Sequence, residues 1–147
     1  MRGASIISAV LTAFALFAAP AWGQSVPPEP AAALARALDA HTTALARDRY
    51  ALAAGPLVGA ADVRTAGRTL VRLWAGQDYV FAAACEQACG GFNLRVVAPD
   101  GAVLAQDAGA APLVRVRPLV TGRHVIEAAP SRCGAPSCWF AVNVYAR

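Results

Sequence analysis

Four cysteines are the residues of this sequence best suited to chemistry, and they lie in two close pairs. Cys85 and Cys89 are four positions apart, and Cys133 and Cys138 are five positions apart. These intervals match zinc-binding spacings only loosely, and neither contains the Cys-x-x-Cys motif of thiol redox enzymes. We therefore predict two structural disulfides, which are common in proteins of oxidising compartments.

The spacing alone leaves more than one disulfide connectivity open. We favour the local pairs Cys85–Cys89 and Cys133–Cys138, because each would close a loop between successive strands. Such small loops restrict the unfolded chain least, so each disulfide is expected to contribute about 2 kcal/mol to stability. Pairing across the two loops is the alternative, since both loops can lie at one end of the fold.

The remaining reactive side chains form no recognised catalytic motif. The sequence lacks a G-x-S-x-G elbow, an H-E-x-x-H helix, a phosphate loop and a dinucleotide fingerprint. His41 and His124 lie on apolar faces, where a histidine is more often a packed core residue than a base. Asp100 and Asp107 flank an expected hairpin, and turn roles explain them more simply than a calcium site does. We predict no catalytic residue, no metal and no cofactor.

A few arginine and aromatic residues are candidates for binding. Arg115 and Arg117 alternate with valines, so one face of their strand would present a small basic strip to an anionic glycan, a lipid head group or an acidic partner. A solvated strand face explains the same pattern. Trp74, Trp139 and Tyr145 offer rings that can stack on sugars, although core packing explains them equally well. We select Arg115, Arg117, Trp139 and Tyr145 as candidate binding residues.

Residues 1–23 have the pattern of an export signal. Ile6 to Ala19 is an almost unbroken apolar run that ends at Pro20, and small residues precede Gln24 as at a cleavage site. The run is shorter than the roughly 20 residues of a membrane span, and no later stretch is long enough. We predict an exported chain, periplasmic or extracellular, with no membrane span after signal cleavage at Gly23 or Ala21.

Composition excludes nucleic acid as a partner. The 147-residue chain has a formal net charge of +4, and all of its basic residues are arginines spread along the sequence. A nucleic-acid-binding protein would gather its positive charge on one face or helix. The length fits one domain with a modest core, and it leaves the oligomeric state open.

The N-terminal third of the exported chain is predicted to contain a helix. Residues 24–30 form a Pro-rich tether. Residues 31–66 form a helical segment with a connector, in which the helix ends near Ala54 because Gly55-Pro56 is a strong stop signal. Its apolar stripe follows alternating four- and three-residue steps and comprises Leu34, Leu38, His41, Leu45 and Leu52.

From Gly67 to Arg147 the sequence alternates as β-strands do. In the clearest example, Phe92, Leu94 and Val96 alternate with polar residues, and Pro99-Asp100-Gly101 supplies a turn after them. Turn signals recur at intervals of about 8 to 12 residues. We predict a mainly β fold, an antiparallel β-sandwich of about seven strands preceded by an N-terminal α-helical segment.

Residues 67–147 resemble a bacterial pre-peptidase C-terminal (PPC-type) β-sandwich domain. The matching positions lie in one strand, one hairpin and a later strand: Gly76, Tyr79 and Phe81; Leu94, Pro99 and Gly101; Pro118, Gly122, His124 and Ile126. The chain departs from the family at Gly91, Phe92 and Asn93, where acidic residues are common, and at His124, where an aromatic residue is common. The resemblance implies a β-sandwich, and the first departure argues against carrying over calcium binding.

Three classes of function fit the sequence. We predict an exported, non-catalytic binding or accessory module of the cell envelope, with an envelope protein or a glycan as its partner. One alternative is a structural or assembly protein that docks through its N-terminal helix. The other is a small hydrolase with an unrecognised site, which would need His41 or His124 to be accessible beside a serine or an aspartate.

Overall fold

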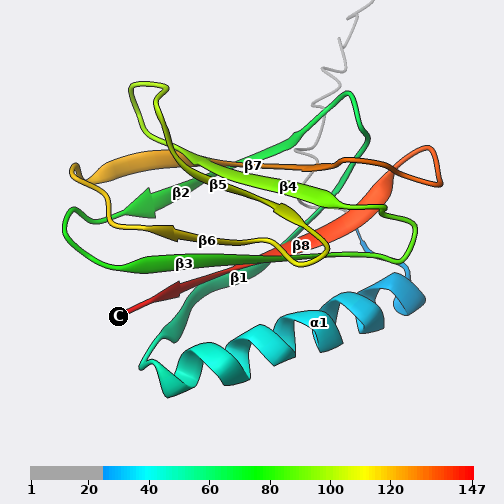
Figure 1. The fold of residues 1–147 in the computed structure, drawn as a ribbon, viewed down its shortest axis with the longest axis horizontal. Coiled ribbons are helices and arrows are strands. Elements are labelled where there is room, and N and C mark those ends of the chain that lie inside the picture. The colour runs from blue at the N-terminus through cyan, green and yellow to red at the C-terminus, as the bar shows by residue number, and fades with distance from the viewer. Residues whose placement is uncertain (1–24) are drawn as a thin grey trace, which may run out of the picture.

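The computed structural model describes residues 25–147, which form one helix and eight strands (Figure 1). The expected signal peptide lies outside the described residues. In chain order the elements are α1 (Pro28–Arg47), β1 (Ala51–Ala61), β2 (Gly67–Leu73), β3 (Tyr79–Cys85), β4 (Phe92–Val97), β5 (Val103–Gly109), β6 (Leu113–Val116), β7 (Gly122–Pro130) and β8 (Cys138–Ala146).

The strands form two antiparallel sheets of four strands each. The first sheet has the order β1-β8-β3-β6 and the second the order β2-β7-β4-β5. This arrangement confirms the mainly β fold and its preceding helix, with eight strands in place of about seven.

The core lies between the two sheets and is built from the alternating residues of their facing sides. Phe81 and Phe140 come from the first sheet, and Phe92, Leu94 and Ile126 come from the second. The rings of Phe92 and Phe140 meet with their centroids 5.2 Å apart, a tilted contact between the sheets.

Helix α1 covers the outer face of the first sheet (Figure 1). The buried residues Leu34, Leu38 and Leu45 contact the sheet, as the helical stripe predicts, and His41 on the same stripe is half-buried. The side chains under the helix are Val80, Ala82, Ala84, Ala141 and Tyr145. Strands β3 and β8 are therefore buried on both faces. No helix of residues 25–147 is long and apolar enough to cross a bilayer.

The predicted helix end near Ala54 is wrong. The helix ends at Arg47, and Arg49 has a φ of 63°, a left-handed conformation that turns the chain back toward the sheet. The residues expected to form the end of the helix and the connector form β1 instead, paired with β8. Leu52 is accordingly exposed on a strand and does not extend the helical stripe.

The stop signal at Gly55-Pro56 marks an irregularity inside β1. The pairing of β1 with β8 shifts register between Leu52 and Leu57, around this dipeptide. Gly55 has a φ of 124°, and a Cβ atom there would lie 2.5 Å from Asn143 Oδ1, so the position requires glycine. Proline is accommodated because β1 is an edge strand. The sandwich thus begins at Ala51 and not at Gly67, and the helix begins at Pro28, inside the expected tether.

The disulfides have the favoured local connectivity, Cys85–Cys89 and Cys133–Cys138. Cys89 and Cys133 also lie opposite each other in a short antiparallel bridge. Backbone hydrogen bonds of 2.9 Å from Gly90 N to Arg132 O and from Gly134 N to Ala88 O flank that bridge. The two small loops are therefore neighbours at one end of the sandwich.

We expect Leu38→Ala to lower the free energy of unfolding by about 2 to 5 kcal/mol, because it opens a cavity between the helix and the sheet. Arg36→Ala, on the exposed side of the same helix, is the control and should change it by less than about 0.5 kcal/mol. Urea denaturation followed by circular dichroism measures both. A loss below about 1 kcal/mol for Leu38→Ala would show that the helix does not unfold together with the sandwich.

Tryptic digestion without reduction tests the connectivity. Trypsin cleaves after Arg72, Arg95 and Arg132, so local pairing gives separate peptides 73–95 and 133–147, each with its disulfide intact. Cross-pairing would instead join these two peptides into one species by mass. Replacing Cys133 and Cys138 together with alanine should then lower the free energy of unfolding by about 2 kcal/mol, the value for so short a loop.

Candidate functional site

The two arginines predicted to form a basic strip have different surroundings. Arg115 lies on the edge strand β6, with its guanidinium carbon 5.8 Å from the centroid of the Tyr50 ring. Arg117 follows the strand, donates a hydrogen bond of 3.0 Å to Gly76 O and lies 3.9 Å from the Asp78 carboxylate. Both are exposed, but each has a separate local partner.

The two candidate aromatic residues lie beneath helix α1. Tyr145 is fully buried, and its hydroxyl shares a hydrogen bond of 2.7 Å with Thr42 Oγ1 and accepts one of 3.0 Å from Asn143 Nδ2. Trp139 is half-buried and packs against the cluster that contains Leu34 and Leu38. Both rings thus contribute to the attachment of the helix, and the buried ring of Tyr145 offers no face to a sugar.

His124 is a fully buried core residue. Its Nδ1 lies 3.1 Å from the carbonyl oxygen of Gly122, and its Nε2 has no hydrogen-bond partner within residues 25–147. The Gly122 carbonyl oxygen can accept a hydrogen bond from Nδ1 when this nitrogen carries a hydrogen. The position is closed to substrates, and His41 lies on α1, on the other side of the first sheet.

Asp100 and Asp107 stabilise the chain around β5. Asp100 Oδ1 accepts a hydrogen bond of 3.0 Å from the backbone of Ala102 in the hairpin turn. Asp107 accepts bonds of 2.8 and 2.9 Å from the backbones of Ala108 and Leu113. Within the described part of the chain, no group of three His, Cys, Asp or Glu side chains is arranged to hold a metal ion.

The second sheet has an outer face that helix α1 does not cover (Figure 1). The strand register places Arg68, Glu127, Arg95 and Gln106 opposite one another, in one row across β2, β7, β4 and β5. Polar side chains from four separate segments of the sequence are thereby brought together on one surface.

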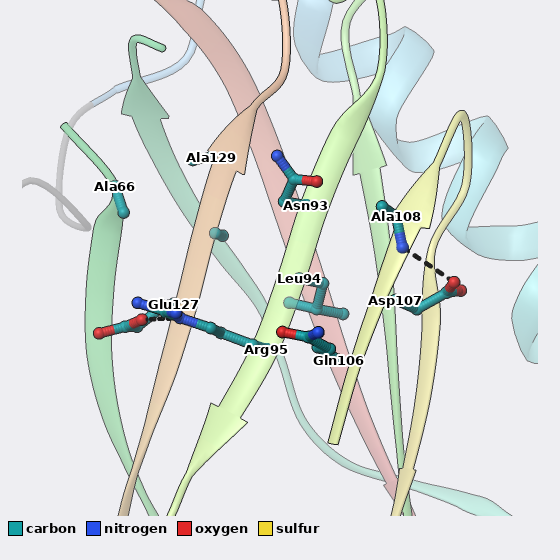
Figure 2. A pocket seen from close by; sticks show the side chains of 10 residues that line it. Ala66, Asn93, Leu94, Arg95, Gln106, Asp107, Ala108, Glu127 and Ala129 are labelled. Atoms are coloured by element: carbon teal, nitrogen blue, oxygen red, sulfur yellow. Dashed lines mark hydrogen bonds and ion pairs between the residues drawn. The ribbon is translucent and has the colours of Figure 1, made fainter. Parts of the chain in front are cut away.

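Glu127 is the centre of this row. Its side chain is only 4% exposed, and its two carboxylate oxygens form ion pairs with Arg68 and Arg95, which are both exposed. Figure 2 shows Arg95 reaching from β4 to Glu127 on β7. A buried carboxylate requires such partners, and here they fix the positions of both guanidinium groups.

An open groove of about 530 Å³ lies beside this row (Figure 2). Arg95, Asn93 and Gln106 contribute polar side chains to it, and its small apolar residues are Ala66, Ala108, Ala128 and Ala129. Asn93 Nδ2 donates a bond of 3.1 Å to Ser131 Oγ, whereas the amide of Gln106 has no hydrogen-bond partner within residues 25–147. The groove therefore presents amide and guanidinium donors, with one amide free, over a floor of small residues.

The sequence pattern does not mark these residues as a site. The alternation of Asn93 and Arg95 with apolar neighbours indicated an exposed strand face, but their partners Arg68, Glu127 and Gln106 lie on other strands. Only the register of the sheet places these residues side by side.

We expect Glu127→Gln to lower the free energy of unfolding by about 1 to 3 kcal/mol, because a neutral amide cannot form charge-assisted bonds with two guanidinium groups. Glu29→Gln, on an exposed position of α1, is the control and should have little effect. Urea denaturation of both variants makes the comparison. Equal effects of the two substitutions would contradict a structural role of the row.

Comparisons with known proteins give no match for this chain, neither with the models of protein families nor among curated proteins. The PPC-type resemblance therefore stays a prediction that rests on turn and core residues. The chain is described by its own fold, an antiparallel sandwich of two four-stranded sheets with a helix packed on one of them.

Proposed function

We propose that this chain is an exported, non-catalytic binding module of the cell envelope, and that it binds a glycan in the groove on its second sheet. The observation that carries the proposal is the groove itself, in which polar side chains from three strands surround a floor of small residues. Concave sites with a few convergent polar groups are the usual place for ligands on a fold.

The charges in and around the groove favour a neutral, hydroxyl-rich ligand. The two arginines Arg68 and Arg95 both form ion pairs with the carboxylate of Glu127. An anionic ligand would have to compete with Glu127 for the guanidinium groups. Sugar hydroxyls can instead accept hydrogen bonds from Arg95 and Asn93 and both donate to and accept from the free amide of Gln106.

The surroundings of the other candidates support binding over the two alternatives. The leucine stripe of α1 packs on the chain's own first sheet, so this apolar face is not available for docking to another protein. His124 is buried in the core, and its Nδ1 lies beside the Gly122 carbonyl oxygen and not beside a serine or an aspartate. Export is proposed from the signal pattern of residues 1–23, and the paired cysteines support an oxidising compartment.

A glycan array tests the proposal with the exported chain. We expect the wild-type protein to bind a set of neutral glycans, and the double variant Asn93→Ala with Gln106→Ala to lose at least about tenfold in affinity, as expected when two or more hydrogen bonds are removed. Gln87→Ala, an exposed glutamine in a disulfide loop, is the matched control and should bind as the wild type does.

Two results would reject the glycan proposal. The first is the absence of any bound glycan with folded wild-type protein. The second is equal binding by the double variant and the control, which would place the contact surface elsewhere on the molecule. Circular dichroism spectra of all variants verify that the fold is unchanged.

A further inference from the structure

Bulky apolar side chains are exposed at the end of the sandwich opposite the disulfides. Leu119 is 93% exposed, Val120 54% and Trp74 52%. Trp74 begins the turn between β2 and β3, and the other two lie in the loop between β6 and β7. We call these three residues the apolar tip. Both connections lie at the same end of the molecule in Figure 1.

Hydrogen bonds lock the two connections of the apolar tip together. Gly76 N donates a bond of 2.9 Å to Pro118 O, and Ala75 N donates one of 2.9 Å to Thr121 Oγ1. Arg117 Nε donates a further bond of 3.0 Å to Gly76 O. The apolar side chains are therefore held outward by an ordered backbone, and their exposure does not depend on the chance position of a loose loop.

Positive charge surrounds the apolar tip. The Arg72 guanidinium carbon lies 4.9 Å from the centroid of the Trp74 ring, and Arg72 faces Arg123 across β2 and β7. Arg117 lies beside the turn between β2 and β3, where it is bonded to Gly76 O. Of the acids at this end, Asp78 is shared between Arg117 and Arg147, and Asp100 lies in the β4–β5 turn. Arginines outnumber carboxylates here, so the tip complements a negatively charged surface.

We propose that the apolar tip docks the protein on the surface of a bilayer that contains anionic phospholipid. Leu119 and Val120 would enter the boundary between head groups and acyl chains, Trp74 would lie at the head-group level, and the neighbouring arginines would contact lipid phosphates. A side chain that is 93% exposed protrudes from the surface, which suits a deformable bilayer better than a protein partner that lacks a matching pocket.

The tip and the groove are separate surfaces. The groove residues Asn93 and Ala129 lie toward the cysteine end of the second sheet, whereas Arg72 and Arg123 lie toward the tip. A protein attached through its tip would hold the groove away from the bilayer. Failure of either proposal therefore leaves the other to be judged by its own experiment.

Sedimentation with vesicles tests the tip. We expect the exported chain to sediment with vesicles of phosphatidylglycerol and phosphatidylcholine, and much less with phosphatidylcholine alone. Leu119→Ser with Val120→Ser should reduce the binding to anionic vesicles at least about tenfold, because it removes the apolar side chains that enter the bilayer. Val63→Ser, at an apolar residue of similar exposure in the β1–β2 connection at the cysteine end, is the control and should bind normally. Arg123→Gln should weaken binding to the anionic vesicles only.

Brominated lipids give a second measurement, made with a Trp139→Phe and a Trp74→Phe variant so that one tryptophan reports at a time. Bromine atoms near the head of the acyl chain should quench Trp74 at the tip in the first variant but not Trp139, which packs under the helix, in the second. Absence of binding to anionic vesicles, an equal loss in the control variant, or binding without quenching would overturn the proposal. The groove variant Asn93→Ala with Gln106→Ala should bind the vesicles as the wild type does.

Discussion

The double burial of strand β8 is the constraint on which the rest of the structure depends. The strand is hydrogen-bonded to β1 on one side and to β3 on the other. Phe140, Val142 and Val144 face the other sheet, and Ala141 and Tyr145 face the helix. Because neither face meets water, the helix must stay attached, and the polar atoms under it must find partners. The Tyr145 hydroxyl is bonded to Thr42 and to Asn143 Nδ2, whereas Asn143 Oδ1 has no hydrogen-bond partner within residues 25–147.

The same constraint makes the molecule asymmetric. The helix covers the first sheet, so exposed polar and charged side chains gather on the second sheet and at the loop tips. The second sheet alternates apolar inward and polar outward along β4, as antiparallel sheets with one solvated face do. A surface of this kind leaves room for a recognition site without disturbing the core, because the residues that would contact a ligand are not those that hold the sheets together.

The sequence pattern predicted those parts of the fold in which alternation is strong. Phe92, Leu94 and Val96 lie in the core, and the turn at Asp100 and the short disulfide loops occur where expected. Strand β1 was not predicted, because its small residues show no clear alternation of apolar and polar side chains. In addition, Leu52 fits the spacing of the helical stripe by coincidence. Its place is set by pairing with β8, a contact between residues far apart in the chain.

The site was harder to predict than the fold. Trp139 and Tyr145 alternate with the core residues Phe140, Val142 and Val144, which places them on the other face of β8. The pattern does not show that a helix covers this face. The groove depends on register across β4, β5 and β7, which the sequence of a single strand does not contain. The contact of Arg117 was not predictable for a related reason, because its hydrogen-bond partner Gly76 lies in a turn that is distant in the sequence.

The adjacent disulfide loops have a mechanical consequence. Every connection between consecutive strands passes from one sheet to the other, except the β4–β5 hairpin. The loops that contain Cys89 and Cys133 are two of these crossings, and their backbones are bridged to each other. At this end, a force that pulls the two sheets apart would therefore act on connections that each contain a disulfide. At the other end it would act on turns that are held together by hydrogen bonds. Separation of the layers would start at the end remote from the cysteines.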